Sequence, residues 1–108
     1  MAEIDTPRPP PLHVEVVEDG GVPLVRLAGE LDLSTAETVR SAIAPILAAE
    51  PVRLAFDLSG LKFMDSTGIA IMVHAANQVP EVEVRRPSRA IRQVIAITGL
   101  TDRFEIVE

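Results

Sequence analysis

The chain has 108 residues, of which 47% are hydrophobic and 24% are charged, as expected of one globular domain with a single core. Its net charge of −6 argues against binding nucleic acid or an anionic membrane through a basic patch. The absence of cysteine excludes disulfides and thiolate metal sites, and no apolar run approaches the roughly 20 residues that span a membrane. We therefore expect a cytoplasmic protein with no nucleic-acid or membrane partner.

A tail and a hairpin are predicted at the start of the chain. Residues 1–11, MAEIDTPRPPP, are rich in proline and predict a flexible tail, which leaves residues 12–108 as the domain. The runs LHVEVV at 12–17 and VPLVRLAG at 22–29 flank the turn sequence EDGG. This arrangement predicts two antiparallel strands.

The next stretch predicts an amphipathic helix. Ser34 and Glu37 have the spacing of a capping box at a helix start. The apolar residues that follow at helical spacing are Ala36, Val39, Ile43, Ile46 and Leu47. Pro45 lies inside this pattern, where proline costs about 3 kcal/mol. We expect a kink or an early break there, with Ile46 and Leu47 packing to hold the final turn.

Strands and helices alternate along the rest of the chain. Strands are predicted at 52–58, 82–85 and 104–107. A helix that opens at the sequence DSTG carries an apolar stripe formed by Ile69, Met72, Val73 and Ala76. Ser88 is the expected cap of a last helix, and Gly99 marks its end.

Charged residues alternate with apolar ones along the predicted strands. They would share one uncovered side of the sheet, and they are Arg53, Asp57, Glu83, Arg85 and Glu105. The strand–helix alternation implies parallel crossovers after the hairpin. The sequence therefore predicts an α/β fold, a single domain with a mixed β-sheet and helices mainly on one face.

The segment Asp65-Ser66-Thr67-Gly68 lies between a strand and a helix, where α/β folds place their sites. An aspartic protease needs the glycine directly after the hydroxyl residue, and here an extra residue intervenes. A nucleophile elbow, Gly-x-Ser-x-Gly, fits better, but Met64 occupies the position of the first glycine. A serine hydrolase that uses Ser66 is thus a less favoured alternative.

Histidine bases and metal ligands are scarce in this sequence. A hydrolase would have to take its base from His13 or His74. His13 lies on a predicted strand, and His74 lies on the same predicted helix as Ser66. The histidines and carboxylates lack metal-ligand spacing, and the glycines form no phosphate-binding loop. We expect no catalytic residue, no metal and no cofactor.

The third interpretation of the segment is a helix cap that can be phosphorylated. Ser66 stands where a helix start leaves backbone N–H groups unpaired, so its hydroxyl is expected to act as the N-cap. A phosphate at this position is favoured by the helix dipole. Asp65, together with Asp32 at the end of another strand, would surround it with like charge.

Three motifs give the chain a family resemblance: LAGELDLSTAE at 27–37, FDLSGLKFMDSTGIAIM at 56–72 and ITGLTDRFEI at 97–106. The chain resembles a STAS domain, and among these the small bacterial anti-sigma factor antagonists. The resemblance covers residues 12–108 and implies a binding protein rather than an enzyme.

The resemblance also implies a switch and its partners. The unphosphorylated form would bind an anti-sigma factor, a serine kinase with a histidine-kinase-like ATPase fold, and so free a sigma factor. The kinase would phosphorylate Ser66, with Thr67 as second candidate, and a PP2C-type phosphatase would reverse the reaction. A role as a STAS subunit of another assembly, such as a stress-signalling complex or a transporter, is the nearest alternative.

A partner surface is expected around Ser66. At about 100° per residue, one side of the helix lies opposite the buried stripe, and Ile71 is expected to be either exposed there or covered by a neighbouring helix. The predicted partner-binding residues are Asp32, Leu33, Ser34, Asp65, Thr67, Gly68, Ala70, Ile71 and His74.

Overall fold

The computed structural model describes residues 11–108, so the predicted tail lies outside the described residues except for Pro11. Five strands form one mixed sheet in the order β1-β2-β3-β4-β5. β1 runs antiparallel to β2, and the other neighbours are parallel. The strands are β1 (Leu12–Asp19), β2 (Val22–Leu31), β3 (Arg53–Met64), β4 (Glu81–Arg85) and β5 (Glu105–Val107).

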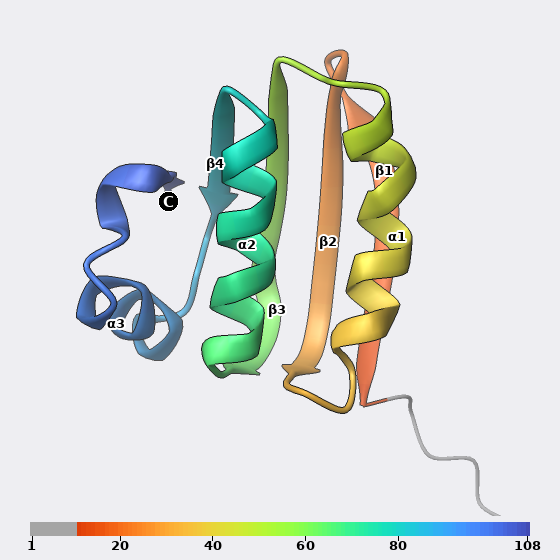
Figure 1. Cartoon of the computed structure of the whole chain (residues 1–108). Coiled ribbons are helices and arrows are strands. Elements are labelled where there is room, and N and C mark those ends of the chain that lie inside the picture. Colours follow the sequence, from red (N-terminus) through yellow and green to blue (C-terminus); the bar gives the residue numbers. More distant parts are fainter. Residues whose placement is uncertain (1–10) are drawn as a thin grey trace, which may run out of the picture.

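Three helices connect the parallel strands. They are α1 (Ala36–Ala48), α2 (Ser66–Gln78) and α3 (Arg89–Ile97), with a 3-10 turn at Thr101–Arg103. Figure 1 shows α1 and α2 side by side across the same face of the sheet, with α3 beyond them at the β4 side. The predicted α/β fold, a mixed sheet with helices mainly on one face, is therefore confirmed.

Local sequence signals explain the hairpin and the last helix. Gly20 and Gly21 both have positive φ, +61° and +85°, which a two-residue type I′ turn requires. The Ser88 hydroxyl accepts a hydrogen bond from the N–H of Ile91 at 3.2 Å and so caps α3 as predicted. Gly99, at φ +74°, follows the end of this helix.

Pro45 does not end α1, so of the expected kink or early break, the break does not occur. The helix continues through Pro45 to Ala48, with Leu47 buried in the core. Because Pro45 has no N–H, the carbonyl of Ser41 loses its helical partner. Both residues lie on the exposed side of the helix, where water can hydrogen-bond to that carbonyl.

The predicted strand at 52–58 is displaced and longer than expected. Val52 is exposed and precedes β3, and its carbonyl accepts the N–H of Glu81 at 3.1 Å. Beyond it, Leu54, Phe56 and Leu58 are fully buried beneath the helices. The opposite face of β3 therefore carries the charged positions.

This helix-free face of the sheet is covered by ion pairs. Asp57 lies at its centre, 3% exposed, with a carboxylate oxygen 2.7 Å from Arg86 and 3.6 Å from Arg26. The remaining pairs join Arg26 to Glu15, Arg53 to Glu81 and Glu105, and Arg85 to Glu83 and Asp19. The predicted side of shared charge is confirmed, with Asp57 buried rather than solvated.

Asp57 stays ionised although it is buried. Burial alone would raise its pKa, but hydrogen bonds from Ser59 and the hydrogen bond and charge of Arg86 outweigh burial and hold the pKa below its usual value. The backbone N–H of Ser59 donates to the carboxylate at 3.0 Å. Arg86 itself has a positive φ of 51°, a conformation that costs energy in a residue with a side chain.

We expect Asp57→Asn to lower the free energy of unfolding by roughly 1–3 kcal/mol at pH 7, because it removes a buried charged acceptor. Because the pKa of Asp57 is lower in the folded protein than in the unfolded chain, its charge stabilises the fold at pH values above the unfolded-state pKa of about 3.9. This stabilisation is lost as the pH falls through the folded-state pKa. The difference from the wild type in urea denaturation should therefore shrink below about pH 4. The matched control is Glu15→Gln, which breaks a half-exposed pair with Arg26 and should cost at most about 1 kcal/mol. A pH-independent difference would contradict this role of the charge.

Candidate functional site

The candidate site lies where the ends of β2 and β3 meet. Leu31 pairs with Met64 at the carboxyl ends of these parallel strands. The next residues, Asp32 and Asp65, therefore lie at the same edge of the sheet. The N–H of Asp65 also donates to the carbonyl of Leu31 at 3.2 Å. This hydrogen bond joins the end of β2 to the residue that precedes α2.

Asp65, not Ser66, caps α2. The Asp65 carboxylate accepts a hydrogen bond from the N–H of Thr67 at 2.8 Å, and its backbone is extended as an N-cap requires. The expectation that the Ser66 hydroxyl is the cap is wrong. The carboxylate precedes the helix, so it reaches the free N–H groups first, and its charge also favours the helix N-terminus.

Ser66 is the accessible hydroxyl of the segment. It is exposed at the first position of α2, whereas Thr67 is half-buried. Within residues 11–108 the Ser66 hydroxyl makes no side-chain hydrogen bond. A modifying enzyme would therefore not have to break such a bond to reach it.

Asp32 organises the loop before α1. Its Oδ1 atom accepts hydrogen bonds from the Ser34 hydroxyl at 2.7 Å, the Ser34 N–H at 2.9 Å and the Thr35 N–H at 3.3 Å. The Ser34 hydroxyl is the main reason that the pKa of Asp32 lies below its usual value. The predicted capping box of Ser34 and Glu37 is therefore wrong, because Asp32 holds Ser34 and the helix starts at Ala36.

The Asp32 loop presents an apolar side chain to solvent. Leu33 is 78% exposed, and Thr35 is buried beneath it with its hydroxyl donating to the carbonyl of Glu30 at 3.0 Å. Phe63, which pairs with Glu30 near the same strand ends, is 49% exposed. Sequence reasoning did not identify Phe63. A register irregularity around Lys62 decides where this side chain points, and no periodicity in the sequence reveals it.

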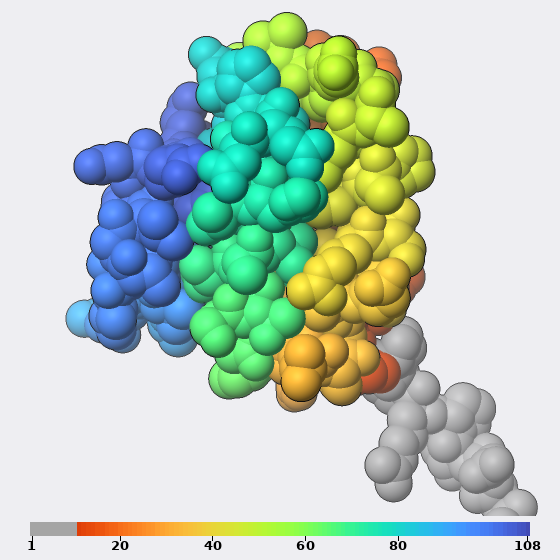
Figure 2. All heavy atoms as spheres, viewed as in Figure 1, coloured from red at the N-terminus to blue at the C-terminus, as the bar shows by residue number. Residues whose placement is uncertain are grey.

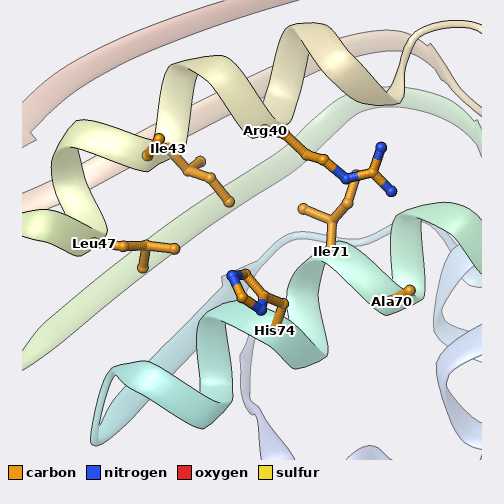
Figure 3. Close-up of a pocket in the computed structure, with 7 residues that line it drawn as sticks. Arg40, Ile43, Leu47, Ala70, Ile71 and His74 are labelled. Atoms are coloured by element: carbon orange, nitrogen blue, oxygen red, sulfur yellow. The ribbon is translucent and has the colours of Figure 1, made fainter.

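Two of the predicted partner-binding residues are buried in the structure. Gly68 packs so closely that a Cβ atom would lie 2.4 Å from Cγ of Met64, so its role is to let α2 approach β3. Ile71 is 3% exposed, and its side chain points toward α1 (Figure 3). Of the two alternatives for Ile71, the structure has the covered one, because α1 lies over this side of α2, and the predicted role of Ile71 as an exposed partner contact is wrong. Ala70 and His74 are exposed as expected.

The positions of the histidines do not support a serine hydrolase. At 1.5 Å per residue, His74 lies about 12 Å further along α2 than Ser66, and its ring is hydrogen-bonded to Gln78. His13 lies on β1 beside Ala28 of β2. Within residues 11–108, no group of His, Asp and Glu side chains could hold a metal ion, and no helix is long and apolar enough to cross a membrane.

The chain is similar to a known protein family and to several known proteins. A model of the family described as STAS domain matches residues 13–108. The chain is 29% identical to the anti-sigma-F factor antagonist RsfB of Mycobacterium tuberculosis, over 91% of this chain and 83% of that protein. It is 33% identical to the anti-sigma-B factor antagonist of Listeria monocytogenes, over 74% of this chain and 74% of that protein.

A solved structure extends the likeness to three dimensions. The crystal structure of an anti-sigma factor antagonist from Mycobacterium paratuberculosis superposes with a TM-score of 0.82 at 29% sequence identity. The match covers 89% of this chain and 85% of that one. Sequence and fold thus point to the same group of proteins.

The division of roles between Asp65 and Ser66 can be tested by denaturation. We expect Asp65→Ala to lower the free energy of unfolding by about 1 kcal/mol, because the N–H of Thr67 loses its acceptor. Asp65→Asn should retain most of this stability, since asparagine also caps helices. Ser66→Ala should change it by less than about 0.5 kcal/mol. An equal loss in Ser66→Ala and Asp65→Ala would show that the Ser66 hydroxyl has a structural role.

Proposed function

The chain belongs to the STAS domain family, and we propose that it acts as an anti-sigma factor antagonist switched by phosphorylation of Ser66. In its unphosphorylated form it binds an anti-sigma factor and so frees a sigma factor for transcription. The observation that carries this proposal is the exposed hydroxyl of Ser66 at the start of α2, beside a helix cap that does not depend on it.

The partner in this proposal is also the modifying enzyme. The anti-sigma factor is a serine kinase with a histidine-kinase-like ATPase fold, and a PP2C-type phosphatase restores the hydroxyl. The kinase forms a bond between the Ser66 oxygen and the γ-phosphorus of ATP as the bond to ADP breaks, and the hydroxyl proton leaves to a base of the kinase. The chain itself is substrate and ligand rather than catalyst, and it works in the cytoplasm, where sigma factors bind their polymerase.

Charge at the strand ends explains how the phosphate would prevent binding. A phosphoserine carries about −1.5 to −2 charges, and it would stand next to Asp65 and near the loop of Asp32. In the free protein, water and the helix N-terminus accommodate this charge. In a closed interface the water is displaced, and a charge without a partner costs several kcal/mol.

The first test identifies the phosphorylated residue and its effect. The unmodified chain is used to capture proteins from a lysate of the source organism, and the captured kinase is purified and incubated with the chain and ATP. Peptide mapping should place the phosphate on Ser66 rather than on Ser34, Ser59 or Ser88. Ser66→Ala should bind the kinase with wild-type affinity and accept no phosphate, whereas Ser66→Asp should bind at least about a hundredfold more weakly, or about 2.7 kcal/mol.

Thr67→Ala is the matched control for this test. It should still be phosphorylated, because its neighbour Ser66 is unchanged. A main phosphate on another serine, or unchanged binding after phosphorylation of Ser66, would disprove the proposed switch.

A second prediction concerns the extent of the structural change. Phosphorylation should act through local charge and size, because Asp65 caps the first turn of α2 without using the Ser66 hydroxyl. Amide chemical shifts of the two forms should differ mainly at residues 32–34 and 64–74. Widespread shifts that reach β5 would contradict this local mechanism and indicate a conformational switch.

A further inference from the structure

A groove of about 510 Å³ lies between α1 and α2. The helices lie side by side on the surface shown in Figure 2, and Figure 3 shows side chains from both helices converging on the space between them. The floor is apolar and is formed by the buried side chains of Ile43, Leu47 and Ile71. The two rims carry small exposed residues, Ala44 on α1 and Ala70 on α2, so another chain can approach closely.

The groove also has a distinct charge. Arg40 of α1 and His74 of α2 complete its lining, and none of the lining residues is acidic. Figure 3 shows the Arg40 side chain extending from α1 toward α2. Within residues 11–108 Arg40 takes part in no ion pair, unlike the arginines of the helix-free face. The groove is therefore an apolar site with an arginine at its edge, in a chain whose net charge is −6. This arginine favours a ligand that carries an acidic group.

The groove is continuous with the site around Ser66. Residues four apart on a helix lie above one another, so Ser66, Ala70 and His74 follow one line along α2. A partner that covers Ser66 and continues along this line therefore reaches the groove. A phosphate on Ser66 would stand one helical turn from Ala70 and would repel the same acidic ligand that Arg40 attracts.

We propose that this groove binds an apolar side chain of the anti-sigma factor, with an adjacent carboxylate of that partner paired to Arg40. This inference rests on the proposed function and adds α1 to the surface around Ser66. The apolar side chain lies between Ala44 and Ala70 on the floor of the groove. The carboxylate accepts hydrogen bonds from the guanidinium of Arg40, and the His74 ring lies on the opposite rim.

The test fills the groove or reverses its charge. Isothermal titration would compare the wild type with Ala44→Leu, Ala70→Leu and Arg40→Glu against the purified anti-sigma factor kinase captured by the unmodified chain. Each variant should weaken binding at least tenfold, and Arg40→Lys should weaken it less than Arg40→Glu. The matched controls lie on the exposed side of α3, Ala96→Leu and Arg89→Glu, and should bind within about threefold of the wild type.

The outcomes separate this inference from the proposed function. If Ser66→Asp loses binding while the groove variants bind like the wild type, the groove assignment is wrong and the proposed function stands. If the wild type binds no anti-sigma factor, both are wrong. Sedimentation velocity tests a second copy of the chain as the other occupant. A dimer of the wild type that Ala70→Leu abolishes would overturn the assignment to the anti-sigma factor.

Amide spectra keep the test independent of folding. All variants change exposed side chains, so their spectra should match the wild type outside α1 and α2. A variant with a collapsed spectrum is replaced by Ala44→Ser or Ala70→Ser, which keep the groove open and should bind within threefold of the wild type. Loss of binding in these serine variants would contradict a role for groove shape.

Discussion

The site depends on how Asp65 joins the end of β2 to the start of α2. Its backbone N–H donates to the carbonyl of Leu31, and its carboxylate accepts the N–H of Thr67. One residue thereby fixes the position of a loop and the first turn of a helix. These two hydrogen bonds place Ser66 beside the Asp32 loop at the edge of the sheet.

The cap on Asp65 has a consequence for the neighbouring serine. A hydroxyl that caps a helix contributes about 1 kcal/mol, and modification would change that hydrogen bond. Here the carboxylate provides the cap, so Ser66 can change its chemical state while the helix start remains satisfied. The Asp32 loop is likewise held by its own hydrogen bonds, which leaves Leu33 exposed. The fold thus separates the residues that hold the site from those that are free to react or bind.

The features predicted correctly from sequence depend on short-range signals. The glycines at 20 and 21 determine the hairpin turn, and Ser88 caps α3, because turns and caps involve residues only a few positions apart. The capping box of Ser34 failed for a local reason too, since Asp32 accepts hydrogen bonds from both the hydroxyl and the N–H of Ser34 and holds this residue in the loop before the helix. The pattern at 34–37 fits both arrangements, and only the three-dimensional loop decides between them.

Long-range packing explains the other errors. Helical periodicity in the sequence locates the centre of the buried side of α2, but it does not show how far around the helix the burial extends. In the structure α1 covers a further part of the helix surface, which includes Ile71. Strand alternation placed Asp57 on the helix-free face but could not show its burial, because Arg26 and Arg86 reach it from other parts of the chain. Predicting such contacts requires the order of the strands in the sheet and the directions of the side chains. The alternation of strands and helices in the sequence gives neither.

The two faces of the sheet consequently have different roles. On the helix-free face, the arginines of β2, β3 and β4 are paired with carboxylates of the same chain, so an acidic partner would have to displace those carboxylates. On the other face, α1 and α2 bury the core and leave Arg40 facing an apolar groove that leads to Ser66. In the proposed function, recognition would therefore take place on the side of the sheet opposite to the stabilising ion pairs. In the proposed switch, a phosphate at the start of α2 would then change the charge of the helix side of the sheet and leave the ion pairs on the other side in place.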